Sequence, residues 1–254
     1  MSRPASIERV STGVAGLDAM TEGGFLAGHT VLAAGSPGTG KTTLGLHFTA
    51  AGAAVDEPTV YVSFEYLPEQ LYRDAEARGW PLREWEEAGL VRVLCTSPEI
   101  LLGRDGVSLL EESVRRIGAK RLVIDSMTHF ESLGSDPQAL RTQLSGLVNQ
   151  LRLLGVTTLV THEVSEIVGP AVRLSTWGLE FMVDAVLLLR YVELEGQLEK
   201  AIAVLKFRGS GHDRRFRHIQ LGASGMTVED AYKGVEGLTG GSARRLKERA
   251  RRLV

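Results

Sequence analysis

Short apolar runs alternate with longer amphipathic stretches through the first two thirds of the chain. The runs are rich in β-branched and aliphatic residues, which is typical of buried strands, and they cover residues 30–34, 59–65, 91–95, 121–126 and 156–161. The stretches between these runs predict helices. The first helix follows the run 30–34 and ends at about residue 52, and the others cover 69–78, 81–89, 105–118 and 137–154. Such an alternating series is typical of a parallel sheet that binds ligands at the carboxyl ends of its strands.

The pattern changes after residue 182. Two β-rich runs, 183–193 and 200–207, flank the segment 194–197 and predict a hairpin, and a further strand is expected over 217–221. We therefore predict an α/β protein whose mostly parallel central sheet is flanked by helices and ends in an antiparallel extension of strands. A single domain is expected over residues 1–239.

The composition fits one domain with a sizeable core, because 43% of the 254 residues are hydrophobic. No apolar run reaches the roughly 18–20 residues that a membrane-spanning helix needs. The first residues also lack the charged and then apolar layout of a signal peptide, so we expect a cytoplasmic protein without a transmembrane segment. The single cysteine, Cys95, excludes an internal disulfide and lies in an apolar run, which predicts a buried thiol.

The formal net charge of −2 hides a basic C-terminal segment. Residues 240–254 contain six lysines and arginines against one acidic residue, Glu248. The rest of the chain is therefore acidic, whereas a nucleic-acid-binding protein usually carries a basic body. We expect residues 240–254 to form a basic tail outside the domain, which is typical either of a solubilising terminus or of a segment that docks on an acidic partner or a membrane surface.

Residues 35–42 match G-x-x-x-x-G-K-T, the phosphate-binding P-loop pattern, between a predicted strand and a predicted helix. The glycines permit a tight turn in which successive backbone N–H groups point at an anion, and the helix adds its positive N-terminal dipole. Lys41 brings a charge to the β- and γ-phosphates, and the Thr42 hydroxyl is a ligand for Mg²⁺. The predicted nucleotide-binding residues of this segment are Gly35, Ser36, Pro37, Gly38, Thr39, Gly40, Lys41, Thr42 and Thr43.

Asp125 follows a short apolar run, which is the Walker B pattern of P-loop proteins. In that pattern the aspartate holds the Mg²⁺ shell beside the P-loop hydroxyl. Together, Thr42 and Asp125 predict a site for ATP and Mg²⁺. The sequence shows no base-specific motif that would distinguish ATP from GTP.

This layout resembles the RecA-like ATPases and, within them, the KaiC family. The matching segments are Ser-Thr-Gly-Val-Ala-Gly-Leu-Asp at 11–18, the P-loop at 35–42, Ser-Phe-Glu at 63–65, Ile-Asp-Ser at 124–126 and Lys-Phe-Arg-Gly-Ser-Gly-His at 206–212. The resemblance covers about residues 7–230. Members of this family that act in the circadian clock carry two such domains in tandem, and this chain holds one, so a clock function is not implied.

The resemblance implies that Glu65 is the base that polarises the attacking water. The chemistry agrees, because a carboxylate at a strand end beside the phosphates can orient a water in line with the γ-phosphorus. The family often has two adjacent glutamates here, whereas Tyr66 follows Glu65 in this chain, so we expect slow hydrolysis. The phosphorylated positions of the clock members correspond to Glu180 and Phe181, which accept no phosphate, so autokinase activity is disfavoured.

The same resemblance implies that Lys206 and Arg208 reach across a subunit interface to the γ-phosphate of a neighbouring subunit. With Lys41 and Glu65 they make up the predicted catalytic set. Their alternation along a strand puts both side chains on one face, which is also typical of a charged edge strand that deters aggregation. The resemblance places further residues near nucleotide: Phe207, Ser210 and His212 beside the neighbour's, Arg78 against the adenine, and Thr161 with His162 as a γ-phosphate sensor.

We therefore expect an ATPase that acts as a homo-oligomeric ring, with a hexamer favoured, nucleotide at the subunit interfaces, and a regulatory role through a protein partner. The alternative is a recombination ATPase of the RecA or RadA type on DNA. The corresponding DNA loops would be 127–139 and 163–178, and Arg173 is their only lysine or arginine, so nucleic acid is disfavoured. A nucleotide switch with little turnover is compatible with the first interpretation.

Overall fold

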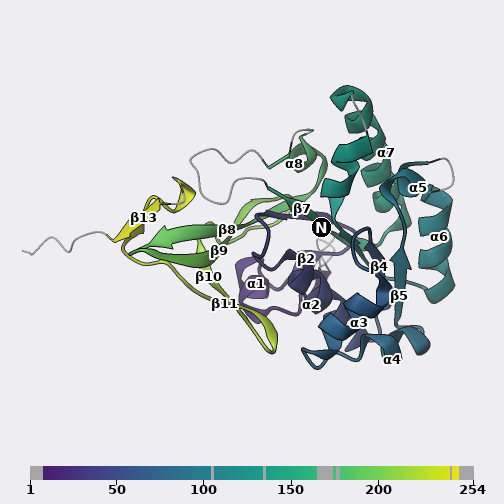
Figure 1. Ribbon diagram of the computed structural model, residues 1–254, viewed down its shortest axis with the longest axis horizontal. Coiled ribbons are helices and arrows are strands. Elements are labelled where there is room, and N and C mark those ends of the chain that lie inside the picture. Colours follow the sequence, from purple (N-terminus) through teal and green to yellow (C-terminus); the bar gives the residue numbers. More distant parts are fainter. Residues whose placement is uncertain are drawn as a thin grey trace, which may run out of the picture.

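The computed structural model describes residues 8–103, 106–133, 136–164, 174–175, 178–240 and 242–245. Its centre is a parallel sheet in the order β8–β3–β7–β6–β4–β5 (Figure 1). The strands are β3 (Thr30–Gly35), β4 (Thr59–Ser63), β5 (Val91–Cys95), β6 (Arg121–Asp125), β7 (Thr157–Glu163) and β8 (Ala185–Leu194). All of β3, β4 and β6 is buried, which explains their continuous apolar runs.

Beyond β8 the sheet continues as an antiparallel meander. It consists of β9 (Gln197–Phe207), β10 (Arg217–Gly222) and β11 (Gly225–Ala231), each antiparallel to its predecessor. In Figure 1 this extension reaches out of the helix-flanked part of the molecule. The predicted α/β class, with a mostly parallel sheet and an antiparallel extension, is confirmed.

The short strand β13 (Ser242–Arg245) lies in the basic C-terminal segment. It pairs in parallel with β8 at Glu193 and Leu194, beyond the point where β3 stops pairing with β8. On its other side it pairs antiparallel with β12 (Val235–Glu236). The turn η2 (Leu238–Gly240) precedes it. Residues 242–245 of the segment predicted as a basic tail over 240–254 thus form a strand of the sheet, and residues 241 and 246–254 lie outside the described residues.

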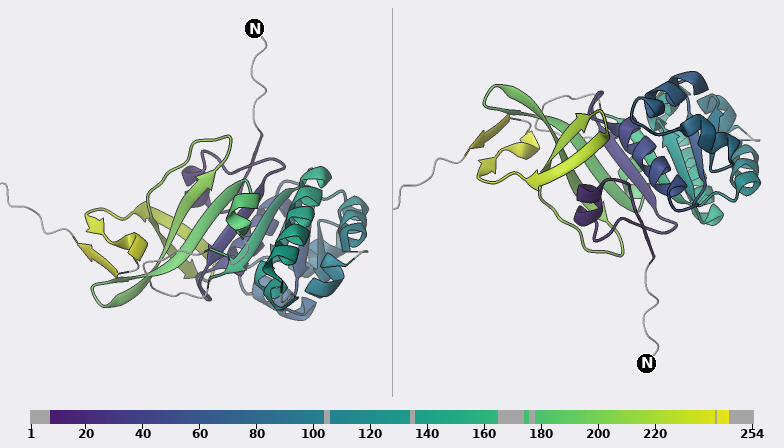
Figure 2. Two further views of the ribbon diagram at one scale, coloured as in Figure 1. Left: turned by 90° about the horizontal axis from the view of Figure 1, so that it is seen from above. Right: turned by 90° about the horizontal axis from the view of Figure 1, so that it is seen from below.

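Helices cover the two faces of the sheet, as the two views in Figure 2 show. One face carries α1 (Ala15–Met20), α2 (Lys41–Ala53), α3 (Pro68–Glu76) and α4 (Leu82–Glu87), with Leu44, Phe48 and Leu71 buried between layers. The other carries α5 (Pro98–Leu102), α6 (Gly106–Ile117), η1 (Met127–Leu133), α7 (Pro137–Leu154) and α8 (Leu179–Met182). The core of this second face includes the leucine stripe of α7, namely Leu140, Leu144, Leu147 and Leu151.

The N-terminal segment, residues 8–29, packs beside the P-loop helix α2. It contains the short pair β1 (Arg9–Val10) and β2 (Phe25–Leu26). The buried guanidinium of Arg121, at the start of β6, donates to the Ser11 carbonyl at 2.7 Å and to the Phe48 carbonyl at 3.0 Å. A salt bridge to Glu57 at 2.7 Å balances the charge of Arg121. The segment is therefore tied at once to α2 and to the Walker B strand.

The prediction of a buried Cys95 is wrong. Cys95 is exposed, because β5 is the edge strand of the sheet and the residue lies at its carboxyl end. Its Sγ donates to the carbonyl of Tyr66 at 3.2 Å. The apolar run 90–95 reflects the covered face of β5, and an edge strand leaves its other positions open to solvent.

Within the described residues, no helix is both long and apolar enough to span a bilayer.

Candidate functional site

The P-loop connects the end of β3 to the first residue of α2. Gly38 and Gly40 have positive φ angles of 76° and 106°, conformations that glycine adopts without strain. A Cβ atom on Gly40 would also lie 2.6 Å from the Cε of Met226, so the end of that side chain would have to move to admit it. Helix α2 begins at Lys41, and its N-cap residue, Gly40, has no side chain that could accept from the first N–H groups. Its first N–H groups are therefore available to an anion.

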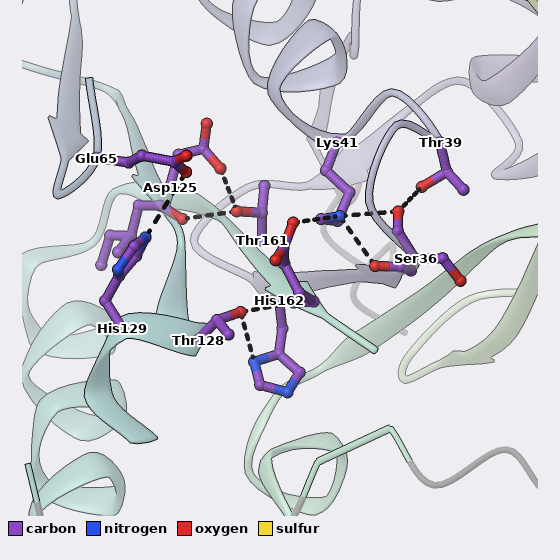
Figure 3. Close-up of polar contacts among 12 residues, drawn as sticks. Ser36, Thr39, Lys41, Glu65, Asp125, Thr128, His129, Thr161 and His162 are labelled. Atoms are coloured by element: carbon purple, nitrogen blue, oxygen red, sulfur yellow. Dashed lines mark hydrogen bonds and ion pairs between the residues drawn. The ribbon is translucent and has the colours of Figure 1, made fainter. Parts of the chain in front are cut away.

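Lys41 is the buried cation of this loop, with a side chain that is 6% exposed. Its Nζ donates to the carbonyls of Gly35 at 2.9 Å and Ser36 at 3.0 Å, and to Oε1 of Glu163 at 3.3 Å (Figure 3). Burial lowers the pKa of Lys41, and the charge of Glu163 opposes that effect. The ammonium thus has three acceptors arranged around it, one of which is a movable carboxylate.

Asp125 lies at the carboxyl end of β6, buried and held by two hydroxyl groups. It accepts hydrogen bonds from the Tyr61 hydroxyl at 3.0 Å and from Oγ1 of Thr161. Burial, with the charge of Asp125, raises the pKa of Tyr61 well above its usual value, so the phenol stays a donor. The Asp125 carboxylate is therefore held in place by two hydroxyl donors, and it lines the same cleft as Thr42.

These donors fit Mg²⁺, which prefers oxygen ligands and usually takes few from the protein. Asp125 and Thr42 line one cleft. Among the described residues, no cluster of three or more His, Cys, Asp or Glu could hold a metal by itself. In nucleotide-binding proteins Mg²⁺ is usually held by one or two protein ligands together with phosphate oxygens and water.

Glu65 follows the end of β4, on the same side of the sheet as Asp125 (Figure 3). Its side chain is 62% exposed, and its Oε2 lies 3.8 Å from Nε2 of His129 on η1. The ring of His129 in turn lies against Phe64. Glu65 is thus a solvated carboxylate at the mouth of the site, where a water molecule can reach it.

The P-loop, Glu65 and Asp125 border a single cleft of about 490 Å³, a size in the range of small-ligand sites. The predicted site residues that line it are Pro37, Gly38, Gly40, Lys41, Thr42, Thr43, Glu65, Arg78 and Asp125. Of the remaining predicted P-loop residues, Ser36 and Thr39 are buried behind the loop, where Oγ1 of Thr39 donates to the Ser36 carbonyl at 2.8 Å. The convergence of the two Walker motifs and Glu65 is thus observed.

Six cleft-lining residues were not predicted: Leu46, Tyr66, Asp74, Ser126, Glu163 and Leu221. Glu163 had a usable signal, since it ends a predicted strand in a parallel sheet and ligands bind at such ends. No sequence signal pointed to Leu221, because its contact with Gly40 depends on where the sheet places β10.

Arg78 reaches the cleft from the end of α3 and donates to the backbone carbonyl of Asp74, which also lines the cleft. The structure thus places Arg78, the residue expected to stack on the adenine, at the cleft.

Five predicted residues lie away from this cleft in the same chain: Lys206, Phe207, Arg208, Ser210 and His212. Lys206 ends up against α8, where its Nζ donates to the carbonyls of Glu180 at 2.9 Å and Val183 at 2.6 Å. Arg208 donates to the Phe181 carbonyl at 3.3 Å. Both side chains therefore lie on one face, as their alternation predicted.

Ser210 lies elsewhere, beside the N-terminal segment. Its hydroxyl accepts from Arg9 at 2.6 Å and donates to Glu22 at 3.2 Å. Glu180 and Phe181, which stand at the positions phosphorylated in the clock members, lie on α8. The carboxylate of Glu180 accepts a hydrogen bond from Oγ of Ser175 at 2.8 Å.

Thr161 and His162, predicted as a sensor pair, point in opposite directions from β7. Thr161 contacts Asp125, whereas the His162 ring lies with its Nδ1 3.4 Å from Oγ1 of Thr128 (Figure 3). The ring is 1% exposed, and its Nε2 lies 3.8 Å from Oε1 of Glu131. The ring does not reach the cleft.

The burial of His162 predicts a pH-dependent stability. Burial, aided by the charge of Lys41, lowers the pKa of His162 from 6.5 to about 4. The unfolded chain therefore binds a proton below pH 6.5 that the folded chain does not, so stability is complete above pH 6.5 and falls as the pH approaches 4. Urea unfolding should show the wild type losing about 3 kcal/mol relative to His162→Gln between pH 7 and pH 4. A difference that stays constant with pH would contradict this.

Comparisons with known proteins agree with the geometry of the cleft. The family described as "ATPase: KaiC" matches residues 10–233. The circadian clock oscillator protein KaiC of Rippkaea orientalis is 30% identical over 246 residues, which cover 97% of this chain and 47% of that protein. The KaiC of Synechococcus elongatus gives the same identity and coverage. This chain thus spans about half the length of the curated relatives it matches.

A solved structure matches over its full length. The crystal structure of a KaiC-like protein from Pyrococcus horikoshii superposes with a TM-score of 0.79 at 31% sequence identity, covering 88% of this chain and 100% of that one. The family match and this structural match both agree with the resemblance inferred from residues 11–18, 35–42, 63–65, 124–126 and 206–212. The chain therefore belongs to the KaiC family of ATPases.

Proposed function

We propose that this protein binds ATP with Mg²⁺ and hydrolyses it slowly as a homo-oligomeric ring, and that its nucleotide state regulates a protein partner. One observation carries the proposal: Lys41 and Thr42 of the P-loop, Glu65 after β4 and Asp125 at the end of β6 border the same cleft. Each has the chemistry that one step of phosphoryl transfer to water requires.

In this proposal the P-loop N–H groups and Lys41 hold the β- and γ-phosphates. Thr42 and Asp125 would hold Mg²⁺, which supplies neutralisation of the phosphate charge. Glu65 accepts a hydrogen bond from a water and orients it toward the γ-phosphorus. As the water oxygen bonds to that phosphorus, Glu65 takes up the proton that the water loses and the bond to the β–γ bridging oxygen breaks, which gives ADP and inorganic phosphate.

The ring is proposed because, in the part of the chain that the structure describes, Lys41 is the one cation of the cleft at the P-loop. Among the described residues of the cleft, the second cation is Arg78, which lies at the α3 rim. Lys206 and Arg208 would supply the missing charge from a neighbouring subunit. The Arg208 side chain is 54% exposed and is thus accessible to such a neighbour. A hexamer is the ring size that we propose.

Slow turnover is proposed because Tyr66, rather than a second glutamate, follows Glu65 in the cleft. A long-lived ATP state suits a protein that signals through a partner. A DNA-dependent role is less well supported, since the described residues after β6, at 127–133, include Glu131 and no lysine or arginine.

Titration calorimetry with Mg-ATP, Mg-GTP and ATP in EDTA tests the binding function. We expect Mg-ATP to bind, and Lys41→Ala to abolish measurable binding, because the phosphates lose the buried cation of the loop. Removal of Mg²⁺ should weaken ATP binding and stop phosphate release. Unchanged ATP binding in Lys41→Ala would contradict the proposal that this cleft is the nucleotide site. Tighter binding of Mg-GTP than of Mg-ATP would show that GTP, rather than ATP, is the preferred nucleotide.

A further inference from the structure

Glu163 is the one acidic group that contacts the P-loop lysine among the ion pairs of the described residues. It is the last residue of β7 and pairs with Gly35, the last residue of β3. Its backbone N–H donates to Oγ1 of Thr128 at 2.7 Å, and the next N–H, of Val164, donates to the Gly35 carbonyl at 3.1 Å. The backbone that carries Glu163 is therefore fixed next to the P-loop.

The side chain of Glu163, in contrast, can leave Lys41. It is 43% exposed, while the Lys41 side chain is 6% exposed. A carboxylate that swings away enters water, whereas a buried ammonium needs another acceptor in its place. The phosphate of a nucleotide is such an acceptor, and the lysine of a P-loop contacts the β- and γ-phosphates.

The carboxylate and the phosphates thus require the same ammonium. They cannot both occupy the cleft beside Lys41 without mutual repulsion, because both are anionic and the pair lies at a partly desolvated site. We propose, on the basis of the ATP-binding function proposed above, that Glu163 competes with the nucleotide phosphates for Lys41 and so weakens nucleotide binding. The γ-phosphate adds charge where Glu163 lies, so the effect is larger for ATP than for ADP. Glu163 is thereby a residue that sets the preference between the two nucleotides.

Glu163→Gln tests this inference, since it removes the charge and keeps the size and an acceptor oxygen. The matched control is Glu131→Gln, a similarly exposed glutamate on η1 whose carboxylate contacts His162 outside the cleft. Calorimetry would measure the Kd of ADP and of AMP-PNP, a non-hydrolysed ATP analogue. We expect Glu163→Gln to tighten AMP-PNP by about tenfold and ADP by less, and Glu131→Gln to change neither.

A second measurement keeps the test independent of folding defects. In the nucleotide-free protein, Glu163→Gln should lower the midpoint of thermal unfolding, because Lys41 loses its charged partner, and AMP-PNP should raise that midpoint more than in the wild type. Glu163→Ala should also tighten AMP-PNP binding. Equal or weaker binding in both variants, with normal binding in the wild type, would overturn this inference alone. A wild type that binds no nucleotide would overturn the proposed function and this inference together.

Discussion

Replacing both Lys206 and Arg208 with alanine is expected to lower the rate of ATP hydrolysis by about 10³–10⁵-fold, the range known for cationic fingers in phosphoryl transfer. The two side chains leave the same end of β9 and lie on one face, against the 180–183 backbone. In a ring they would neutralise the charge that develops on the γ-phosphate of the adjacent subunit. ATP binding should change little, because the P-loop and Lys41 are untouched.

Lys200→Ala is the control for this pair, since Lys200 lies on the same strand and contacts the Tyr191 ring instead of α8. Its hydrolysis rate should match that of the wild type. Because Lys206 also holds two carbonyls near α8, the thermal midpoint of the double variant has to be measured alongside. A fully active double variant would refute the finger assignment.

Mixing two inactive variants decides whether the fingers act between subunits. Subunits with Lys206→Ala and Arg208→Ala keep Glu65, and subunits with Glu65→Gln keep the fingers. If the fingers act on the neighbour, the mixed ring restores activity at interfaces that combine an intact Glu65 with intact fingers. If they act within one chain, the mixture stays as inactive as its parts.

Glu65→Gln is expected to lower the hydrolysis rate by about 10²–10⁴-fold, the usual contribution of a general base. Glutamine keeps the size of the side chain and cannot accept the proton of the attacking water. ATP should still bind, since Glu65 lies at the open side of the cleft and does not contact the P-loop lysine. Single-turnover phosphate release measures the chemical step directly.

The control for Glu65→Gln is Glu69→Gln, an exposed glutamate on α3 that pairs with Arg83. It should hydrolyse ATP at the wild-type rate. Activity that survives in Glu65→Gln would show that another group is the base. The other carboxylates that line the cleft are Asp74, Asp125 and Glu163.

Much of the site could be predicted from sequence because its chemistry is local. The P-loop needs a fixed spacing of glycines and Lys41, and Asp125 follows an apolar strand, so both patterns are visible without a fold. The alternation of strands and helices likewise predicted the parallel sheet, and the strand ends placed Glu65 correctly at the cleft.

The rest depends on contacts between distant segments. The pairing of Glu163 with Lys41 arises because β7 lies beside β3, a neighbour relation that spacing alone does not reveal. The placement of Leu221 next to Gly40 depends on the position of the antiparallel strands β9 to β11 relative to the P-loop. Cys95 was misjudged because an apolar run shows that a strand exists and not whether another strand covers its edge.

The proposal of a ring ATPase is tested most directly by phosphate release from Mg-ATP as a function of protein concentration, with Glu65→Gln as the blank. The account predicts that activity per subunit rises with concentration as interfaces form, reaches a plateau, and disappears in the blank. Activity per subunit that stays constant down to concentrations at which the protein is monomeric would contradict it, because each chain would then complete its own site without Lys206 and Arg208 of a neighbour.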